Sequence, residues 1–161
     1  MNERASPRTT EQASAPAPTA DIEVLLVEDD PDDVTIMTRA LFSSDFQIGL
    51  QVASNGQEAL DLLRKKGQYA DAATPNLVLL DLNMPVMNGR EFLEELRKDS
   101  SLHSIPVIVI TTSDEPDVVR EAYRFGANSV VTKANSIAGM TELMRLVTHY
   151  WFKTSRGFMV D

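Results

Sequence analysis

The feature that most constrains this sequence is an unbroken aliphatic run, residues 77–80, that ends in one carboxylate, Asp81. Aliphatic residues without polar alternation are typical of a strand covered on both faces, as in a parallel sheet. Pro85 cannot continue a central strand, so the chain must leave the sheet within a few residues of Asp81. The run predicts Asp81 at the carboxyl end of a buried strand, the edge where open α/β sheets hold their chemistry. On this run alone, an aspartate that only caps the turn is an equal alternative.

Four other short runs, each followed by apolar residues at helical spacing, make this strand one of a series. They lie at residues 22–27, 46–52, 105–112 and 129–132. Strands that alternate with helices in this way form one parallel sheet with helices on both faces, because the crossovers are right-handed. Five such units predict an α/β domain, a (βα)5 doubly wound sheet with the flavodoxin-like strand order 2-1-3-4-5. Asp114 is expected to cap the fourth helix, which ends at Gly126.

Composition sets the limits of this domain and excludes several classes of function. Residues 1–20, rich in Ala, Pro, Ser and Thr, are predicted to be a disordered tail, which leaves a domain at 21–152 and a short tail at 153–161. The net charge of −9 argues against nucleic acid as a direct partner. No apolar run is long enough to span a membrane, and the absence of cysteine fits a cytoplasmic protein without a thiolate metal site.

A dense acidic cluster follows the first predicted strand. Residues 28–33 hold five carboxylates in six positions. Asp30 can cap the next helix, and the two aspartates after Pro31 favour its positive end. Glu28 and Asp29 precede the cap, and two adjacent carboxylates repel each other unless a cation lies between them. The pair therefore predicts a site for a hard divalent ion with oxygen ligands, Mg²⁺ or Mn²⁺.

The other candidate residues also lie where strands end. Asp81 follows the third strand, Thr111 the fourth and Lys133 the fifth, and the carboxyl ends of parallel strands share one edge. Alone, each type has an ordinary structural role, since acids cap helices, threonine favours strands and lysine is a solvated charge. Together they suit transfer of a phosphoryl group to Asp81, with Lys133 pairing with the phosphoryl oxygens and Thr111 hydrogen-bonding one of them.

The predicted metal ion fits this chemistry. A carboxylate is a weak nucleophile, and the phosphate oxygens repel it. Mg²⁺ held by Asp29, Asp81 and the backbone carbonyl of Asn83, with Glu28 acting largely through water, would neutralise that charge. Phosphorylation would then change the charge at this edge, which can bias a two-state loop or surface.

Four segments resemble the receiver domain of bacterial two-component response regulators: residues 26–30, 79–89, 111–112 and 131–133. The resemblance extends over residues 22–150 and includes each core position of the motif set. It implies that Asp81 accepts a phosphoryl group from the phosphohistidine of a sensor histidine kinase. It also implies a metal site whose ligands are Glu28, Asp29, Asp81 and the Asn83 carbonyl. Thr111 would be the switch residue, and Lys133 would anchor the phosphoryl group.

Finer features resemble the small single-domain regulators that are paired with bacterial phytochromes. They are the loop at 67–75, the pair Arg90-Glu91, and an aromatic ending at 150–152 with no output domain after it. This resemblance implies a stand-alone cytoplasmic phosphoprotein that catalyses only its own phosphorylation and dephosphorylation. A sensor kinase, with a bacterial phytochrome as the first candidate, would be the donor, and the signal would pass by protein–protein contact.

Two positions depart from the receiver pattern. Val130 stands where receivers usually carry a tyrosine or phenylalanine, and Ala134 stands where they usually carry a cis proline. These departures leave open a pseudo-receiver, which is a binding module without a switching output, and a phosphate sink. A metal-dependent phosphatase with an aspartyl nucleophile is a poorer match, because Asn83 stands where its acid/base aspartate would lie.

Three consecutive aromatic residues, 150–152, close the last predicted helix. They cannot all face the core of one helix, and an exposed aromatic patch is typical of a partner surface. We therefore expect a homodimer through the last helix and the C-terminal tail.

Overall fold

A parallel five-stranded sheet forms the centre of the molecule in the computed structural model, which describes residues 20–84 and 86–155. The strands are β1 (Ile22–Val27), β2 (Ile48–Ala53), β3 (Leu77–Leu80), β4 (Val107–Thr111) and β5 (Ser129–Thr132). Their order is β2-β1-β3-β4-β5, which confirms the predicted flavodoxin-like arrangement. The predicted disorder of the first tail, and the end of the second tail, fall outside the described residues.

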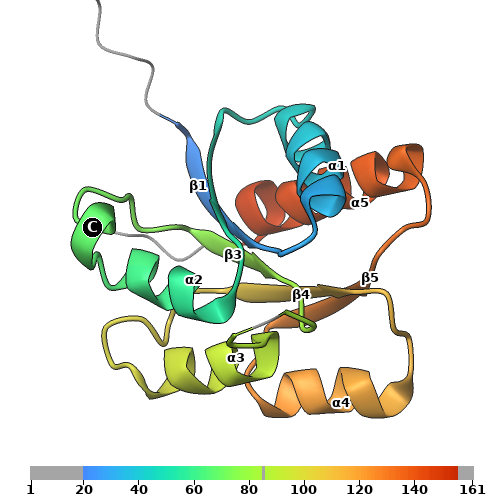
Figure 1. Ribbon diagram of the computed structural model, residues 1–161. Coiled ribbons are helices and arrows are strands. Elements are labelled where there is room, and N and C mark those ends of the chain that lie inside the picture. Colours follow the sequence, from blue (N-terminus) through green and yellow to red (C-terminus); the bar gives the residue numbers. More distant parts are fainter. Residues whose placement is uncertain (1–19, 85, 156–161) are drawn as a thin grey trace, which may run out of the picture.

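Helices cover both faces of the sheet (Figure 1). They are α1 (Pro31–Phe42), α2 (Gly56–Leu63), α3 (Gly89–Lys98), α4 (Pro116–Arg124) and α5 (Ile137–His149), with a 3-10 turn η1 (Gly67–Tyr69) and a π-helical turn η2 (Tyr150–Thr154). α1 and α5 lie on one face and α2, α3 and α4 on the other, as Figure 1 shows. None of these helices, in the part of the chain that the structure describes, is long and apolar enough to cross a membrane.

Side-chain caps fix where most of the helices begin. Asp30 accepts a hydrogen bond from the backbone N–H two residues on at the start of α1, as predicted. Asn55, Asn88 and Ser136 cap α2, α3 and α5 by accepting from the backbone N–H three residues on. The prediction for α4 was wrong, because Glu115 and not Asp114 occupies the capping position and no side chain closes the cap. Pro116 explains the difference, since its fixed backbone angle favours the first helical position.

The core consists of two apolar layers, one on each side of the sheet. Strands β3 and β4 are buried along their whole length, which agrees with their unbroken aliphatic sequence. β2 is an edge strand and is mostly half-buried, in keeping with its alternating sequence. Each fully buried aliphatic side chain contributes roughly 1.5–3 kcal/mol, so the central strands anchor the edge on which the candidate residues lie.

A half-buried arginine, Arg97, joins the segments that precede β4 and β5. The guanidinium of Arg97, near the end of α3, donates hydrogen bonds to the carbonyl oxygens of His103, Ile105 and Gly126 at 2.7–3.0 Å. It also donates to the side-chain oxygen of Asn128 at 2.9 Å. Burial lowers the pKa of Arg97. One side chain therefore provides hydrogen-bond donors for several loop carbonyl groups that have no partner within a strand or helix.

The aromatic residues after α5 divide between the core and the surface. Trp151 and Phe152 pack against the core layer of α1 and α5, and Phe152 meets Phe46 edge to face with ring centroids 5.9 Å apart. Tyr150 is 55% exposed. The three aromatics do not all face the core, as predicted, but two of them do, because the wider π-helical turn changes their directions. The expected aromatic patch is therefore smaller than the sequence indicated.

Candidate functional site

The carboxyl ends of β1 and β3 bring the predicted acidic residues together. The N–H of Glu28 donates to the carbonyl of Ala53 on β2, and the N–H of Asp81 donates to the carbonyl of Val27 on β1, each at 3.0 Å. These bonds extend the parallel pairing by one residue beyond the strands, so both carboxylates leave the sheet at the same level. The predicted convergence on one edge is confirmed for these two residues.

Three carboxylates lie close enough to share one cation. One oxygen from each of Glu28, Asp29 and Asp81 lies within 4.8 Å of the other two. Burial raises the pKa of Glu28 to about 7, against the opposing hydrogen bond from Lys133, and burial likewise raises the pKa of Asp81. A site that disfavours its own negative charges, and that offers only hard oxygen donors, fits a divalent ion such as Mg²⁺ or Mn²⁺.

The loop after Asp81 is held close to the site by a glycine. A side-chain carbon at Gly89 would lie 2.4 Å from the carbonyl oxygen of Asp81 and 2.7 Å from the Cα of Leu82, so only glycine fits here. The loop also bonds to α2, since the N–H of Gly56 donates to the carbonyl of Met87. Asn83 is exposed, and its N–H lies 3.5 Å from Oδ1 of Asp81.

One residue of this loop has an unfavourable backbone conformation. Val86 has a φ of +66° and is 83% exposed. A β-branched residue rarely adopts this left-handed conformation, and such strain persists only where surrounding structure imposes it. The loop that carries Asp81 is therefore held in shape by its neighbours and not by its own preference.

Lys133 reaches the acidic cluster but does not contact Asp81 through a hydrogen bond in this structure. Its Nζ donates to Oε2 of Glu28 at 3.0 Å and to Oδ2 of Asp33 at 2.8 Å. Burial alone would lower the pKa of Lys133, but the hydrogen bonds to Asp33 and Glu28 outweigh it and raise the pKa. The sequence predicted the lysine at this edge but assigned Asp33 only to the start of a helix, so its ion pair was missed.

Thr111 lies beside Lys133 at the end of β4. It is 1% exposed, and its hydroxyl oxygen accepts a hydrogen bond from the N–H of Ser113 at 3.2 Å. Its carbonyl accepts the N–H of Lys133 at 2.7 Å. The fourth and fifth strand ends are thus joined directly, as the sequence predicted from their shared edge.

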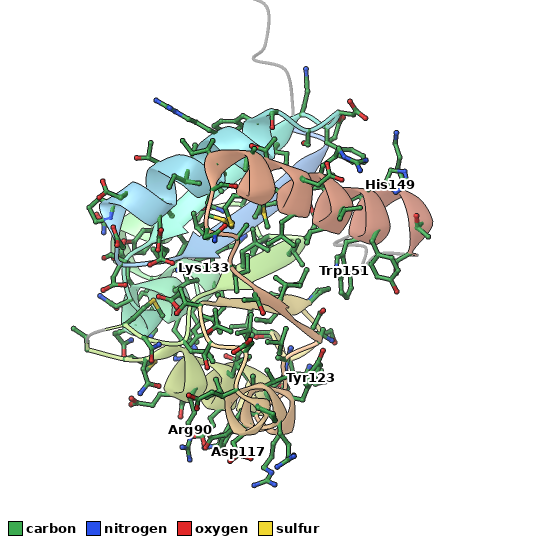
Figure 2. All side chains as sticks on the ribbon, turned by 90° about the vertical axis from the view of Figure 1, so that its right-hand side faces the viewer. Arg90, Asp117, Tyr123, Lys133, His149 and Trp151 are labelled. Carbon is green, nitrogen blue, oxygen red and sulfur yellow. The ribbon has the colours of Figure 1, made fainter. Side chains whose placement is uncertain are left out.

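A neighbouring helix supplies an aromatic side chain beside Val130, where the receiver pattern has its own aromatic residue. Val130 packs against the core, and its N–H donates to the hydroxyl oxygen of Tyr123 at 3.2 Å. Tyr123 belongs to α4 and is 48% exposed (Figure 2). The aromatic group beside β5 therefore comes from α4 and not from β5 itself.

Comparison with known proteins identifies this arrangement. The family model of the response regulator receiver domain matches residues 24–145. The chain belongs to the response regulator receiver family. The predicted family is thereby confirmed, and the molecule is a receiver-type signalling protein.

Several receivers are similar to this one over most of their length. Rcp1 from Synechocystis is 34% identical over 131 residues, which cover 81% of this chain and 89% of Rcp1. The phosphorylated cyanobacterial phytochrome response regulator RcpA is 33% identical with a TM-score of 0.81, covering 86% of this chain and 99% of that one. RPA3017, a response regulator in red light signalling of R. palustris, is 32% identical with the same TM-score and coverage.

A further structure of a receiver concerns the metal. The Mn(2+)-bound form of Rcp1 is 32% identical to this chain with a TM-score of 0.78, and covers 86% of this chain and 99% of that one. These relatives include the phytochrome regulators that the finer sequence features predicted. One of these relatives was solved in a phosphorylated form and another in a Mn(2+)-bound form.

Proposed function

We propose that this receiver accepts a phosphoryl group on Asp81 from the phosphohistidine of a sensor histidine kinase, within a domain of residues 21–152. The observation that carries the proposal is the convergence of three carboxylates, a lysine and a buried threonine on one edge of the sheet. A carboxylate oxygen of Asp81 would attack phosphorus while the bond from phosphorus to the histidine nitrogen breaks. The electron pair would return to the imidazole, which takes a proton from solvent.

The other site residues would prepare Asp81 for this transfer. Glu28, Asp29, Asp81 and the carbonyl of Asn83 would hold Mg²⁺ or Mn²⁺, and the bound ion would supply positive charge that offsets the repulsion between carboxylate and phosphoryl oxygens. Lys133 would pair with one phosphoryl oxygen as a point charge, and the hydroxyl of Thr111 would donate to another. The metal-bound form of Rcp1 and the acidic cluster support the choice of ion.

We infer that a bacterial phytochrome is the first kinase to test and that the reaction occurs in the cytoplasm. The support is the similarity to RcpA and RPA3017, both regulators of red-light or phytochrome signalling. The receiver would catalyse only its own phosphorylation and dephosphorylation. It would pass the signal by contact with another protein. The net charge of −9 argues against nucleic acid as a direct partner.

Phosphotransfer from purified kinases tests this proposal. A panel that includes a bacterial phytochrome is first labelled on histidine and then mixed with the receiver. We expect label to move to the wild-type chain and not to an Asp81→Asn variant, which keeps the shape of the side chain but offers no nucleophilic carboxylate. If every labelled kinase retains its phosphoryl group, or if the Asp81→Asn variant is labelled as well, the proposal is wrong.

We also propose a homodimer through α5 and the C-terminal tail. Leu146 on α5 and Tyr150, the first residue of η2, are 53% and 55% exposed. The N–H of Tyr150 donates to the carbonyl of Leu146, so the two side chains lie one turn apart on one helix face. Phe42, at the end of the neighbouring α1, is 57% exposed. Lys133 precedes α5 and Trp151 follows it, and Figure 2 shows them toward opposite ends of this helix, so a dimer at the end of α5 would leave the phosphorylation edge open. Light scattering of the wild type beside a Leu146→Glu variant should show a dimer only for the wild type, and a monomeric wild type would contradict it.

A further inference from the structure

The lysine expected to bind the phosphoryl group is held in the resting structure by an aspartate outside the predicted site. Lys133 Nζ lies 2.8 Å from Oδ2 of Asp33, which belongs to the first turn of α1, and 3.0 Å from Oε2 of Glu28. The lysine side chain is 12% exposed and that of Asp33 is 36% exposed. Both bonds are charge-assisted, so this geometry is favoured over a solvated ammonium.

Asp33 is suited to give up the lysine when a better acceptor arrives. Glu28 is 3% exposed and belongs to the acidic group itself, whereas the carboxylate of Asp33 can be rehydrated if its partner leaves. An aspartyl phosphate brings a larger negative charge and three strong acceptor oxygens to the position of Asp81. The ammonium has three donors, so it can keep Glu28 and exchange Asp33 for a phosphoryl oxygen.

We propose that Asp33 is a positioning residue that holds Lys133 in the unphosphorylated receiver and releases it on phosphorylation. The inference rests on the proposed function at Asp81. In the resting state Asp33 keeps the ammonium in the cluster without a hydrogen bond to the nucleophile. In the phosphorylated state the tie between α1 and the segment after β5 is lost, so the change at Asp81 reaches α1 through Lys133.

This exchange gives the receiver a route for its signal that does not need an aromatic residue at position 130. Asp33 and Lys133 line a pocket of about 380 Å³ between α1 and the start of α5. Its apolar wall includes Ile36, Met140 and Ile137, the last of which is 60% exposed. Breaking the ion pair removes the polar link across this pocket, so the relative position of the two helices is expected to respond.

Binding of fluoroberyllate, an analogue of the phosphoryl group, tests the proposal in the presence of Mg²⁺. The variants are Asp33→Asn and, as a matched control, Asp32→Asn, which removes an equal charge from the same turn but not the bond to Lys133. Because Asp33 competes with the analogue for the lysine, we expect Asp33→Asn to bind it about two- to five-fold more tightly than Asp32→Asn, the range for a partly exposed ion pair. The nitrogen NMR resonance of the Lys133 ammonium should shift in wild type when the analogue binds, and should already be shifted in free Asp33→Asn.

The outcomes separate this inference from the proposed function. If the wild type binds fluoroberyllate but the two variants have equal affinity and the lysine resonance of Asp33→Asn is unchanged, Asp33 does not position Lys133 and the phosphoacceptor assignment stands. If the wild type does not bind fluoroberyllate with Mg²⁺ at all, both the exchange and the assignment of Asp81 are wrong.

Discussion

Replacing Lys133 with methionine removes the positive charge from the acidic edge while nearly keeping the length of the side chain. In the wild type this ammonium makes two charge-assisted bonds, at 3.0 Å to Glu28 and at 2.8 Å to Asp33. The variant leaves both carboxylates without this partner. We expect the folded state to lose stability, chiefly through Glu28.

The size of the loss follows from the exposure of the two partners. Removing one member of a buried ion pair costs about 3–5 kcal/mol, because the remaining charge cannot be hydrated. Glu28, at 3% exposure, belongs to this class, whereas Asp33 at 36% can reach water and contributes about 0–1 kcal/mol. Glu28 can escape part of the cost by taking up a proton. We therefore expect Lys133→Met to lower the free energy of unfolding by about 3 kcal/mol at a pH above 7.

Urea unfolding without metal, followed by far-ultraviolet circular dichroism and by the fluorescence of the single tryptophan, measures this change. Lys98→Met is the control, because Lys98 is 72% exposed and lies 3.9 Å from Glu95, so its loss should cost little. Adding Mg²⁺ should stabilise Lys133→Met more than the wild type, since the ion takes the place of the missing charge. A variant as stable as the wild type in the absence of metal would refute this account of the cluster.

Three further predictions follow from other parts of the structure. Arg97→Met should lower the free energy of unfolding by about 2–4 kcal/mol, because carbonyl groups in loops lose charged donors. Arg97→Lys should recover only part of the loss. Denaturation curves of the wild type and the two variants measure this, and an unchanged midpoint for Arg97→Met would contradict it. Val86→Asn should raise stability by about 1 kcal/mol by relieving the left-handed backbone, whereas Val86→Thr should not; calorimetry checks the order of the three melting temperatures. The hydroxyl of Ser54 lowers the pKa of Glu58, so the carboxylate stabilises the fold above its unfolded pKa of about 4.5 and this contribution is lost as the pH falls through the lower folded value. The difference in free energy of unfolding between wild type and Glu58→Gln should therefore shrink in acid. A difference that grows as the pH falls would contradict this prediction.

The fold was predictable because each element carries its own local signal. The aliphatic runs that become β3 and β4 are buried throughout, and residues such as Asn55 and Asn88 cap the helices that follow. Boundaries were less certain where no single signal dominates. The edge strand β2 was predicted at 46–52 and observed at Ile48–Ala53, and at α4 Pro116 determined the start in place of Asp114.

The site was predictable only to the extent that topology determines it. A parallel sheet places the ends of β1 and β3 side by side, so the meeting of Glu28, Asp29 and Asp81 follows from the strand order. The partner of Lys133 does not follow, because Asp33 lies 100 residues away and the two adjacent aspartates in the first turn of α1, Asp32 and Asp33, look alike in the sequence. Which carboxylate the lysine reaches depends on side-chain conformations and burial, which no local pattern encodes.

The most direct test of the central claim is the intact mass of the chain after incubation with Mg²⁺ and acetyl phosphate. The matched samples are the wild type with EDTA and the Asp81→Asn variant. The account predicts one phosphoryl adduct on the wild type with Mg²⁺ and none in either control. A folded wild type that gains no adduct, or an adduct that persists in the Asp81→Asn variant, would contradict the assignment of Asp81 as the phosphoacceptor.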